Sequence, residues 1–384
     1  DIIGFTSIIS HYKNLKLFTK IARHNCHSAK IVIGGPLANV LPDYLLKNLD
    51  ADLVICGEGE FSFLRLLQCL ENSEPLINVP GIVFFDDAGN LLKNQVVYAL
   101  PLDQVPILPL EDFNIEPYIN HPLGRSVNIQ LSRGCPNSCS FCDNSIFPKK
   151  IRRRSKENIK NEILRISSKF NIEYIYLDDL NPFLAKGLIA DFCEVMKNIE
   201  KDIEWYGNGY AHTMKTNDFE LLIKGKCKGL HFGIESGSSD VLRIYNKNIN
   251  LQRCKEIIKA AIDHGIEAKV NWIIGAPNES TETIRESIEY FISLGVIPAY
   301  KFLSPLPGTP MFQVAVNKGK IKDIETYLLG WTDWYTDKPY CNISPFSDEE
   351  LIVIAHDAVN EINQKLGIGS THWSGIWRGN QPYN

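Results

Sequence analysis

The chain has 384 residues, of which 44% are hydrophobic and 22% charged, and its formal net charge is −5. A chain of this length usually folds around more than one hydrophobic core, which predicts about two or three domains. The small negative charge argues against a nucleic-acid-binding protein, and no apolar run reaches the ~20 residues that span a bilayer. We therefore expect a globular protein with no nucleic-acid partner and no membrane span.

Ten cysteines are too few for a disulfide scaffold. Most are scattered, several within apolar runs such as DLVICG, and free buried thiols of this kind indicate a reducing cytoplasm. The chain begins at Asp1, inside the strand-like run DIIGFTS. Because a parallel sheet rarely starts so abruptly, we expect that upstream sequence is missing.

Residues 1–99 alternate between short runs rich in Ile and Val and helical stretches. The runs DIIGFTS, AKIVIGG and DLVICG end at glycine or a small polar residue. They predict the parallel strands of a doubly wound, Rossmann-like sheet, incomplete at its start. The segment 81–100 predicts a β-hairpin with DDAGN as its turn. Residues 100–124 are rich in proline, which predicts an extended linker.

From 125 to 310 the alternation returns in longer form. Strand-like runs recur in the order VNIQLSRG, YIYLDD, IEWYGNGYA, LHFGIES, AKVNWIIG and AYKFLSP, with amphipathic helical stretches between them. In one such stretch Ile284, Ile288 and Phe291 share an apolar face that ends at Gly295. Six βα units predict a barrel-like parallel sheet with its chemistry at the carboxyl ends of the strands. Residues 311–384 predict a small, mostly helical C-terminal region.

Three cysteines follow the first of these strands: Cys135, Cys139 and Cys142, spaced C-x3-C-x2-C. A structural zinc site would need a fourth ligand, and a disulfide would leave one thiol over. A four-iron cluster held by three thiolates keeps one iron open for a substrate or cofactor. The residues alone favour the cluster and leave zinc binding and a coincidental trio of packed thiols open.

The segment RGCPNSCSFC, with Phe141 before the third cysteine, resembles the signature of the radical S-adenosylmethionine (SAM) enzymes. The resemblance implies a [4Fe-4S] cluster on the three cysteines, with SAM bound to the open iron. An electron from an external flavodoxin or ferredoxin would cleave SAM to a 5′-deoxyadenosyl radical, which abstracts hydrogen from a substrate. It also implies a partial (βα)6 barrel, in agreement with the six units above.

Later strand ends resemble the SAM-binding elements of the same family. YLDDLNPF stands where the family has a Gly-Gly-Glu element for the SAM amino group; from the residues alone its carboxylates could bind a cation or cap a helix. FGIESGS resembles the segment for the SAM ribose and carboxylate, and IIGAPNES the adenine loop. The resemblance assigns SAM contacts to Phe141, Asp178, Asp179, Glu235, Ser236, Gly275 and Pro277. The arginine that one branch carries after the third strand is absent, and His212 and Lys215 are the alternatives there.

The front segments GGPLANVLPDYLL and DLVICGEGEFSFLRLL resemble the cobalamin-binding branch of the superfamily. The implied cobalamin contacts are Ser7, Gly34, Gly35, Gly57, Glu58 and Gly59. Glycines that end parallel strands stand where a ligand sits on a doubly wound sheet, although simple turn glycines are the alternative. Leu37 replaces a histidine that usually follows Gly-Gly-Pro, and the D-x-H-x-x-G cobalt-ligating motif is absent.

These features predict an enzyme. The leading hypothesis is a cobalamin-dependent radical SAM methyltransferase acting on an unactivated carbon of a small molecule or peptide. The second is a cobalamin-independent radical SAM epimerase, cyclase or rearrangement enzyme, in which Cys341 donates a hydrogen atom as in radical SAM peptide epimerases. A non-catalytic iron–sulfur or zinc module is the third, and the carboxylates and glycines at successive strand ends argue against it.

Overall fold

The computed structural model describes residues 1–98, 101–119, 124–143, 148–331 and 337–367. Contacts divide these residues into two compact units. Unit 1 holds residues 1–98 together with 305–331, and unit 2 holds residues 101–304 together with 337–367. The predicted C-terminal region at 311–384 is therefore divided between the two units, and its residues after 367 lie outside the described part of the chain.

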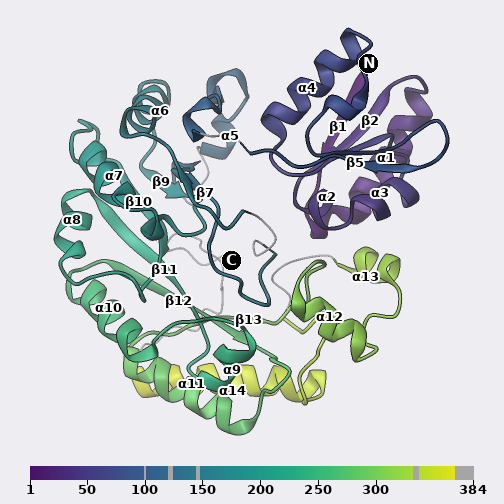
Figure 1. The fold of residues 1–384 in the computed structure, drawn as a ribbon. Helices are drawn as coiled ribbons and strands as arrows, with labels where there is room; N and C mark the ends of the chain where they lie inside the picture. The colour runs from purple at the N-terminus through teal and green to yellow at the C-terminus, as the bar shows by residue number, and fades with distance from the viewer. Residues whose placement is uncertain (99–100, 120–123, 144–147, 332–336, 368–384) are drawn as a thin grey trace. The chain divides into compact units, whose positions relative to one another are not determined.

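Unit 1 is built on a mixed β-sheet whose strands stand in chain order, β1-β2-β3-β4-β5 (Figure 1). The strands are β1 (Ile2–Thr6), β2 (Lys30–Gly34), β3 (Leu53–Ile55), β4 (Ile82–Phe85) and β5 (Leu91–Lys93). β1, β2 and β3 are parallel, and β4 and β5 form the predicted hairpin. Asp86 closes its turn by accepting the Asn90 amide at 2.7 Å. The α/β class is confirmed, but the reversal of strand order that defines a doubly wound sheet is absent among residues 1–98.

The helices of unit 1 come from two separate segments of the chain. They are α1 (Tyr12–Asn25), α2 (Pro36–Val40), α3 (Pro42–Asn48), α4 (Gly59–Glu71), α12 (Pro310–Asn317) and α13 (Ile324–Gly330). Glu325 on α13 accepts the Tyr12 hydroxyl of α1 at 2.6 Å, and it also contacts Lys16 and Tyr44. Partial burial would raise the pKa of Glu325, but these donors outweigh burial and lower it. The carboxylate thereby ties α13 to α1 and α3.

Unit 2 contains a parallel sheet with the strand order β6-β9-β10-β11-β12-β13, which is chain order, so its described part has six strands. The strands are β6 (Ser126–Ile129), β9 (Tyr174–Leu177), β10 (Glu204–Gly209), β11 (Cys227–Glu235), β12 (Glu267–Ile274) and β13 (Ala299–Phe302). Val127, Ile175 and Trp205 stand in register on neighbouring strands and are buried in one core. All six predicted strands are confirmed, and the sheet curls as a half-barrel (Figure 1).

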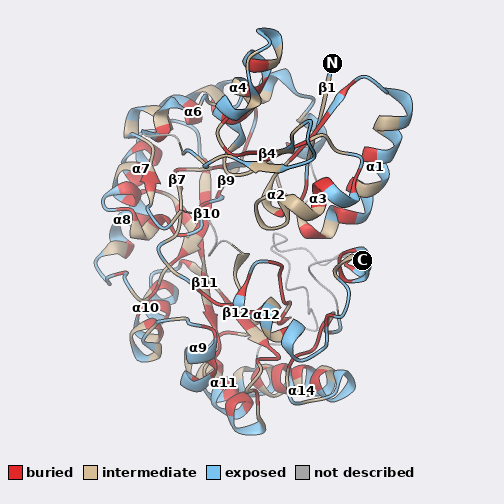
Figure 2. Ribbon diagram, turned by 45° about the vertical axis from the view of Figure 1, so that its right-hand side comes forward, coloured by how far each residue is buried: buried red, intermediate tan, exposed pale blue. Residues whose placement is uncertain are grey.

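Helices cover the outer face of this sheet (Figure 1). They are α6 (Lys156–Lys169), α7 (Leu188–Lys197), α8 (Asp218–Lys224), α9 (Ser239–Ile244), α10 (Leu251–Asp263), α11 (Thr281–Leu294) and α14 (Asp348–Leu366). α11 begins at a Ser280–Thr283 capping box. It ends before Gly295, whose φ is 76°, and this end agrees with the prediction from the sequence. α14 packs on α11 and pairs Glu361 with Arg285 at 2.6 Å. Buried residues, red in Figure 2, follow the strands and the inner faces of these helices.

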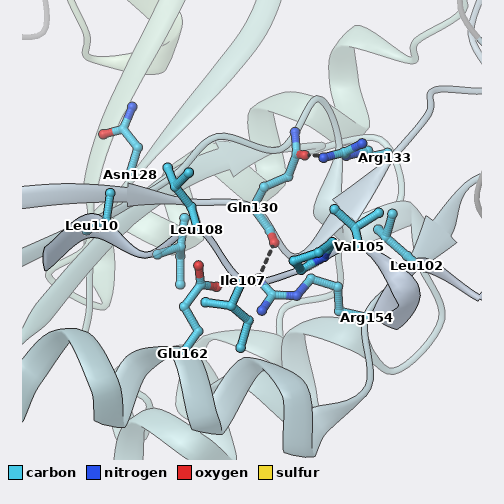
Figure 3. A pocket seen from close by; sticks show the side chains of 12 residues that line it. Leu102, Val105, Ile107, Leu108, Leu110, Asn128, Gln130, Arg133, Arg154 and Glu162 are labelled. Carbon is cyan, nitrogen blue, oxygen red and sulfur yellow. Dashed lines mark hydrogen bonds and ion pairs between the residues drawn. The ribbon is translucent and has the colours of Figure 1, made fainter. Parts of the chain in front are cut away.

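The proline-rich segment, from residue 101 on, is part of unit 2. Its helix α5 spans Glu116–Ile119, and Asp103 accepts the Ser155 amide at 2.8 Å. A cavity of about 200 Å³ lies between this segment, β6 and α6 (Figure 3). Arg154 donates to the Gln130 carbonyl at 2.9 Å and pairs with Glu162, and Arg133 donates to the Gln130 side chain at 2.8 Å. These ties hold the chain where β6 ends. No described helix has the length and apolar character needed to cross a membrane.

Candidate functional site

The loop that carries the three predicted cluster ligands is closed at its base just beyond β6. The short strands β7 (Ser132–Arg133) and β8 (Arg152–Arg153) pair in antiparallel fashion, and the Cys135 amide donates to the Pro148 carbonyl at 3.2 Å. Gly134 has a φ of 104°, and a Cβ there would lie 2.5 Å from the Lys150 carbonyl oxygen. Glycine is therefore required for the chain to enter the loop.

The cysteines share this one loop as free thiols. Cys139 is buried, Cys135 and Cys142 are half-buried, and the Cys142 amide donates to the Cys139 carbonyl at 3.2 Å. Burial raises the pKa of the Cys139 thiol, and the nearby Lys247 ammonium opposes that rise. The loop thus collects three potential thiolates beside one buried cation.

The far side of the loop rests on the turn after α9. The Ser140 amide donates to the Tyr245 carbonyl at 2.8 Å, and the Ser140 hydroxyl donates to the Ile244 carbonyl at 2.7 Å. Asn246 donates its side-chain amide to the Ser138 carbonyl at 2.7 Å. The Phe141 ring meets the Tyr245 ring edge-on, with centroids 5.2 Å apart. Phe141 therefore packs into the loop's support.

The same turn carries an ion pair that reaches the end of β11. The Lys247 ammonium lies 3.4 Å from a Glu235 carboxylate oxygen, and the two side chains are only 12% and 8% exposed. Burial alone would lower the pKa of Lys247, but Glu235 and Cys139 outweigh it and raise that pKa. Glu235 has a φ of 70°, at an irregularity in the pairing of β11 with β12. Lys247 thus interacts both with Glu235, a predicted SAM contact, and with Cys139, a predicted cluster ligand.

Asp178 and Asp179 follow β9 but differ in environment. Asp179 is 1% exposed, and its carboxylate accepts the Leu131 amide at 2.9 Å and the Ser132 hydroxyl at 2.5 Å. Burial raises its pKa to about 6. Asp178 is exposed at the strand end, and desolvation by its surroundings raises its pKa. Asp179 therefore anchors the chain that leads to the cysteines, while the Asp178 carboxylate remains accessible.

The ends of β11 and β12 are held by buried hydrogen bonds. Ser236 is fully buried, and its hydroxyl lies 3.1 Å from that of Ser287 on α11. At the end of β12, Glu279 accepts the amide of Gly275 at 3.0 Å and that of Ala276 at 3.2 Å, and burial raises its pKa. Gly275 has a φ of 106°, which favours glycine, and Pro277 follows half-buried. Glu279 is therefore the residue that shapes this loop.

The donor set fits a cluster better than a single metal ion. Across the described residues, no group of three His, Cys, Asp or Glu side chains is placed to hold one ion. A single zinc ion would need its ligands to converge within ~2.3 Å of one point. The thiolates around a multi-iron cluster need not converge, because each binds a different iron. Three cysteines outside any disulfide on one closed loop match that arrangement.

The predicted cobalamin contacts lie together in unit 1, at the carboxyl ends of β1, β2 and β3. Ser7 is buried and donates its amide to the Gly34 carbonyl at 3.2 Å. Gly35 has a φ of 90°, and a Cβ there would lie 2.4 Å from the Thr6 hydroxyl oxygen. Asn39 accepts the Gly57 amide at 2.5 Å and links the second loop to the third. The remaining two of these residues, Glu58 and Gly59, begin α4.

Cys341 lies in unit 2, in the loop before α14, and is 8% exposed. Three supporting features were not predicted from the sequence: the turn 244–247, the Glu279 side chain and the Asn39 side chain. Asn246, at a φ of 48°, had a detectable signal, because asparagine often takes this conformation at a helix end. The contacts of Glu279 and Asn39 depend on tertiary packing, so no local sequence pattern predicts them.

Comparisons with known proteins agree with this geometry. A family model described as the radical SAM superfamily matches residues 129–291, which include the cysteine loop and four of the strand ends described above. An uncharacterized methyltransferase of Pyrococcus horikoshii is 26% identical over 362 residues, with 91% of this chain and 76% of that protein covered. An anaerobic magnesium-protoporphyrin IX monomethyl ester cyclase of Cereibacter sphaeroides is 27% identical over 343 residues, covering 85% of this chain.

One similar solved structure is the radical SAM methyltransferase TsrM from Kitasatospora setae with cobalamin and a [4Fe-4S] cluster bound. Its TM-score is 0.69 at 15% identity over 83% of this chain, which establishes the likeness of fold. This chain spans 65% of TsrM and 55% of the cyclase. The cysteine loop and the half-barrel agree with the match of residues 129–291 to the radical SAM superfamily.

Proposed function

We propose that this chain is a cobalamin-dependent radical SAM methyltransferase that methylates an unactivated carbon. One observation carries the proposal: the cysteine loop, Asp178, Glu235 and the Gly275 loop meet at the carboxyl edge of one parallel half-barrel. That edge is where such folds gather their catalytic groups. When bound, a [4Fe-4S] cluster supplies the electron that cleaves SAM, and an external flavodoxin-type or ferredoxin-type donor replaces it.

The residues around the loop divide into ligands and supports. Cys135, Cys139 and Cys142 would hold the cluster, and Asp178 would receive the SAM amino group. We assign that contact to Asp178 and not to Asp179, because Asp179 is 1% exposed and its carboxylate accepts two hydrogen bonds inside the protein. The backbone of the Gly275 loop would lie against the adenine, because glycine permits close approach.

Cobalamin would bind to unit 1 at the carboxyl ends of β1, β2 and β3. The loops there are held close to one another by the hydrogen bonds from the Ser7 amide to the Gly34 carbonyl and from the Gly57 amide to the Asn39 side chain. A ligand normally sits outside such strand ends. The likeness to TsrM with cobalamin bound and the relative named a methyltransferase support this assignment. The substrate would be a small molecule or a peptide.

The second candidate keeps the radical chemistry and changes the outcome. The relative named a cyclase shows that a similar chain can bear another activity. In that case the substrate radical would cyclise, rearrange or take a hydrogen atom from Cys341, and cobalamin would not be consumed as a methyl carrier. The two candidates therefore differ in whether a methyl group leaves SAM.

Anaerobic reconstitution with iron and sulfide tests the shared step. The wild-type protein should gain iron–sulfur absorption and release 5′-deoxyadenosine from SAM after reduction by dithionite. The triple variant C135A/C139A/C142A should do neither, and Cys26→Ala, which changes an exposed cysteine elsewhere, should do both. A cluster that forms in the triple variant would contradict the assignment of the ligands.

A second measurement separates the two candidates. The reconstituted protein is incubated with SAM, reductant and extracts that contain candidate substrates, with hydroxocobalamin or without cobalamin. Methyl transfer predicts S-adenosylhomocysteine that depends on cobalamin. Solvent deuterium in the product, lost in Cys341→Ala, would instead favour the epimerase. Failure of unit 1 to bind hydroxocobalamin would remove cobalamin from the proposal and leave the radical step intact.

A further inference from the structure

The turn 244–247 supports the cysteine loop on several sides, although it follows Cys142 by about a hundred residues. It receives the Ser140 amide and hydroxyl on two carbonyls, donates from Asn246 to Ser138, and packs Tyr245 against Phe141. Tyr245 is itself fully buried and donates its hydroxyl to the Ile273 carbonyl on β12 at 3.3 Å. The turn is therefore a rigid platform joined to the core of the half-barrel.

Lys247 ends this platform between two functional segments. Its ammonium pairs with Glu235 at 3.4 Å and interacts electrostatically with Cys139. Its amide donates to the Leu242 carbonyl at 2.9 Å, so the backbone position of the lysine is fixed by α9. Burying such a pair costs free energy, because each ion loses its hydration. Stability alone is therefore a weak explanation for the pair.

We propose that Lys247 is a positioning residue that holds the Glu235 carboxylate in place and raises the reduction potential of the cluster bound by the neighbouring cysteine loop. The proposal rests on the function proposed above, since it requires that cluster. It goes beyond that function because Lys247 binds neither iron nor SAM in the assignment given there. The lysine would act on both through charge and through its ion pair.

The direction of the effect follows from electrostatics. Reduction adds one negative charge to the cluster, and a buried cation beside it stabilises the reduced form more than the oxidised form. Replacing Lys247 by methionine removes that cation and leaves the Glu235 carboxylate unpaired next to the cysteine loop. Both changes disfavour the reduced cluster. Arginine in place of Lys247 keeps the charge, and E235Q/K247M removes both charges together.

The experiment compares the reconstituted full chain in five forms: wild type, K247M, K247R, E235Q/K247M and the control K228M. Lys228 also pairs with a glutamate, at 3.5 Å, but it lies at the opposite end of β11. Iron content is measured first. Each protein is then titrated with dithionite, and the reduced cluster is counted by electron paramagnetic resonance.

At the wild-type midpoint potential, K247M should hold about tenfold less reduced cluster relative to oxidised cluster, a shift of about 59 mV for a one-electron couple. K247R and K228M should remain near wild type, and E235Q/K247M should fall between. If K247M loses its cluster, retention in K247R and in E235Q/K247M still supports the positioning role. A wild-type potential and iron content in K247M would overturn it. A wild-type protein without any cluster would instead refute the proposed function.

Discussion

Ser132 donates its hydroxyl to Asp179 at 2.5 Å, across the gap between the end of β6 and the end of β9. The Leu131 amide donates to the other oxygen of the same carboxylate at 2.9 Å. Both donors directly precede the cysteine loop, so one buried carboxylate fixes the start of that loop. Burial raises the pKa of Asp179 to about 6, which makes this anchor sensitive to pH.

Stability should fall as pH rises through the range set by Asp179. A carboxyl whose pKa is higher in the folded than in the unfolded state binds its proton more tightly when folded. Its favourable contribution is therefore present below the ordinary aspartate pKa of 3.8 and is lost as pH rises through about 6. Between about pH 4.5 and pH 7 this loss amounts to about 2 kcal/mol of unfolding free energy.

Urea titrations of the wild type and of Asp179→Asn at the two pH values measure this loss. The asparagine carries no proton in this range, so the difference in unfolding free energy between the two proteins should change by that amount. Asp202→Asn, at a side chain that is 98% exposed in the same unit, serves as the control. A difference that stays constant with pH would show that Asp179 keeps an ordinary pKa.

Asp178→Asn should weaken SAM binding. A hydrogen bond from the SAM amino group to a carboxylate is charge-assisted, and its loss costs about 1.5–3 kcal/mol, or about tenfold or more in affinity. Equilibrium dialysis of labelled SAM against the reconstituted protein gives the dissociation constant. Tight binding in Asp178→Asn would move the amino-group contact to another residue.

Glu279→Ala should destabilise unit 2 and loosen the Gly275 loop. The substitution leaves the buried amides of Gly275 and Ala276 without their acceptor, at a cost of about 2–4 kcal/mol, while the Thr283 hydroxyl keeps the Ser280 carbonyl as acceptor. Urea unfolding measures the effect. Glu282→Ala changes an exposed glutamate in the first turn of α11, just after this loop, and should change stability little. Equal stabilities for the two variants would contradict this role of Glu279.

Gly35→Ala should disturb the loop ends of unit 1, while Gly4→Ala, at an exposed position of β1, should not. Gly35 has a φ of 90°, and its added Cβ would lie 2.4 Å from the Thr6 hydroxyl oxygen; for Gly4 nothing lies within 4 Å. We expect a loss of about 1–3 kcal/mol and weaker hydroxocobalamin binding for Gly35→Ala. Unfolding curves and absorbance titration with hydroxocobalamin test both, and matching behaviour of the two variants would refute the distinction.

Asn246→Gly and Asn246→Ala separate the two contributions of the platform to the cysteine loop. Glycine keeps the φ of 48° and loses only the hydrogen bond to Ser138, whereas alanine loses both. Iron retained after gel filtration should therefore decrease from wild type to glycine to alanine. Full retention in the alanine variant would show that the loop does not depend on this residue.

Much of unit 2 could be predicted because its pattern is local. Runs such as YIYL and AKVNWII alternate with amphipathic helices, and each parallel strand lies beside its neighbour in sequence, so chain order gives sheet order. Unit 1 was harder. The same kind of runs occurs there, but the sequence does not state whether strand order reverses, and the doubly wound order was not found among its described strands.

The site shows the same division between local and distant information. The spacing of the cysteines and the glycines at strand ends are visible in short segments. The difference between Asp178 and Asp179 is not, because it arises from the Leu131 and Ser132 donors nearly fifty residues earlier. The partnership of Lys247 with Glu235 likewise depends on how α9 returns to the sheet. Such contacts appear only once the fold brings distant segments together.

The attachment of α13 to α1 and α3 through Glu325 has a consequence for biosynthesis. Unit 1 includes residues 305–331, which a ribosome produces only after the strands β6 to β13. Domains near the N-terminus usually complete folding first during translation. Here the hydrogen bonds of Tyr12 and Tyr44 cannot form until Glu325 is translated, about three hundred residues later. The half-barrel strands are therefore all synthesised before the first unit can close.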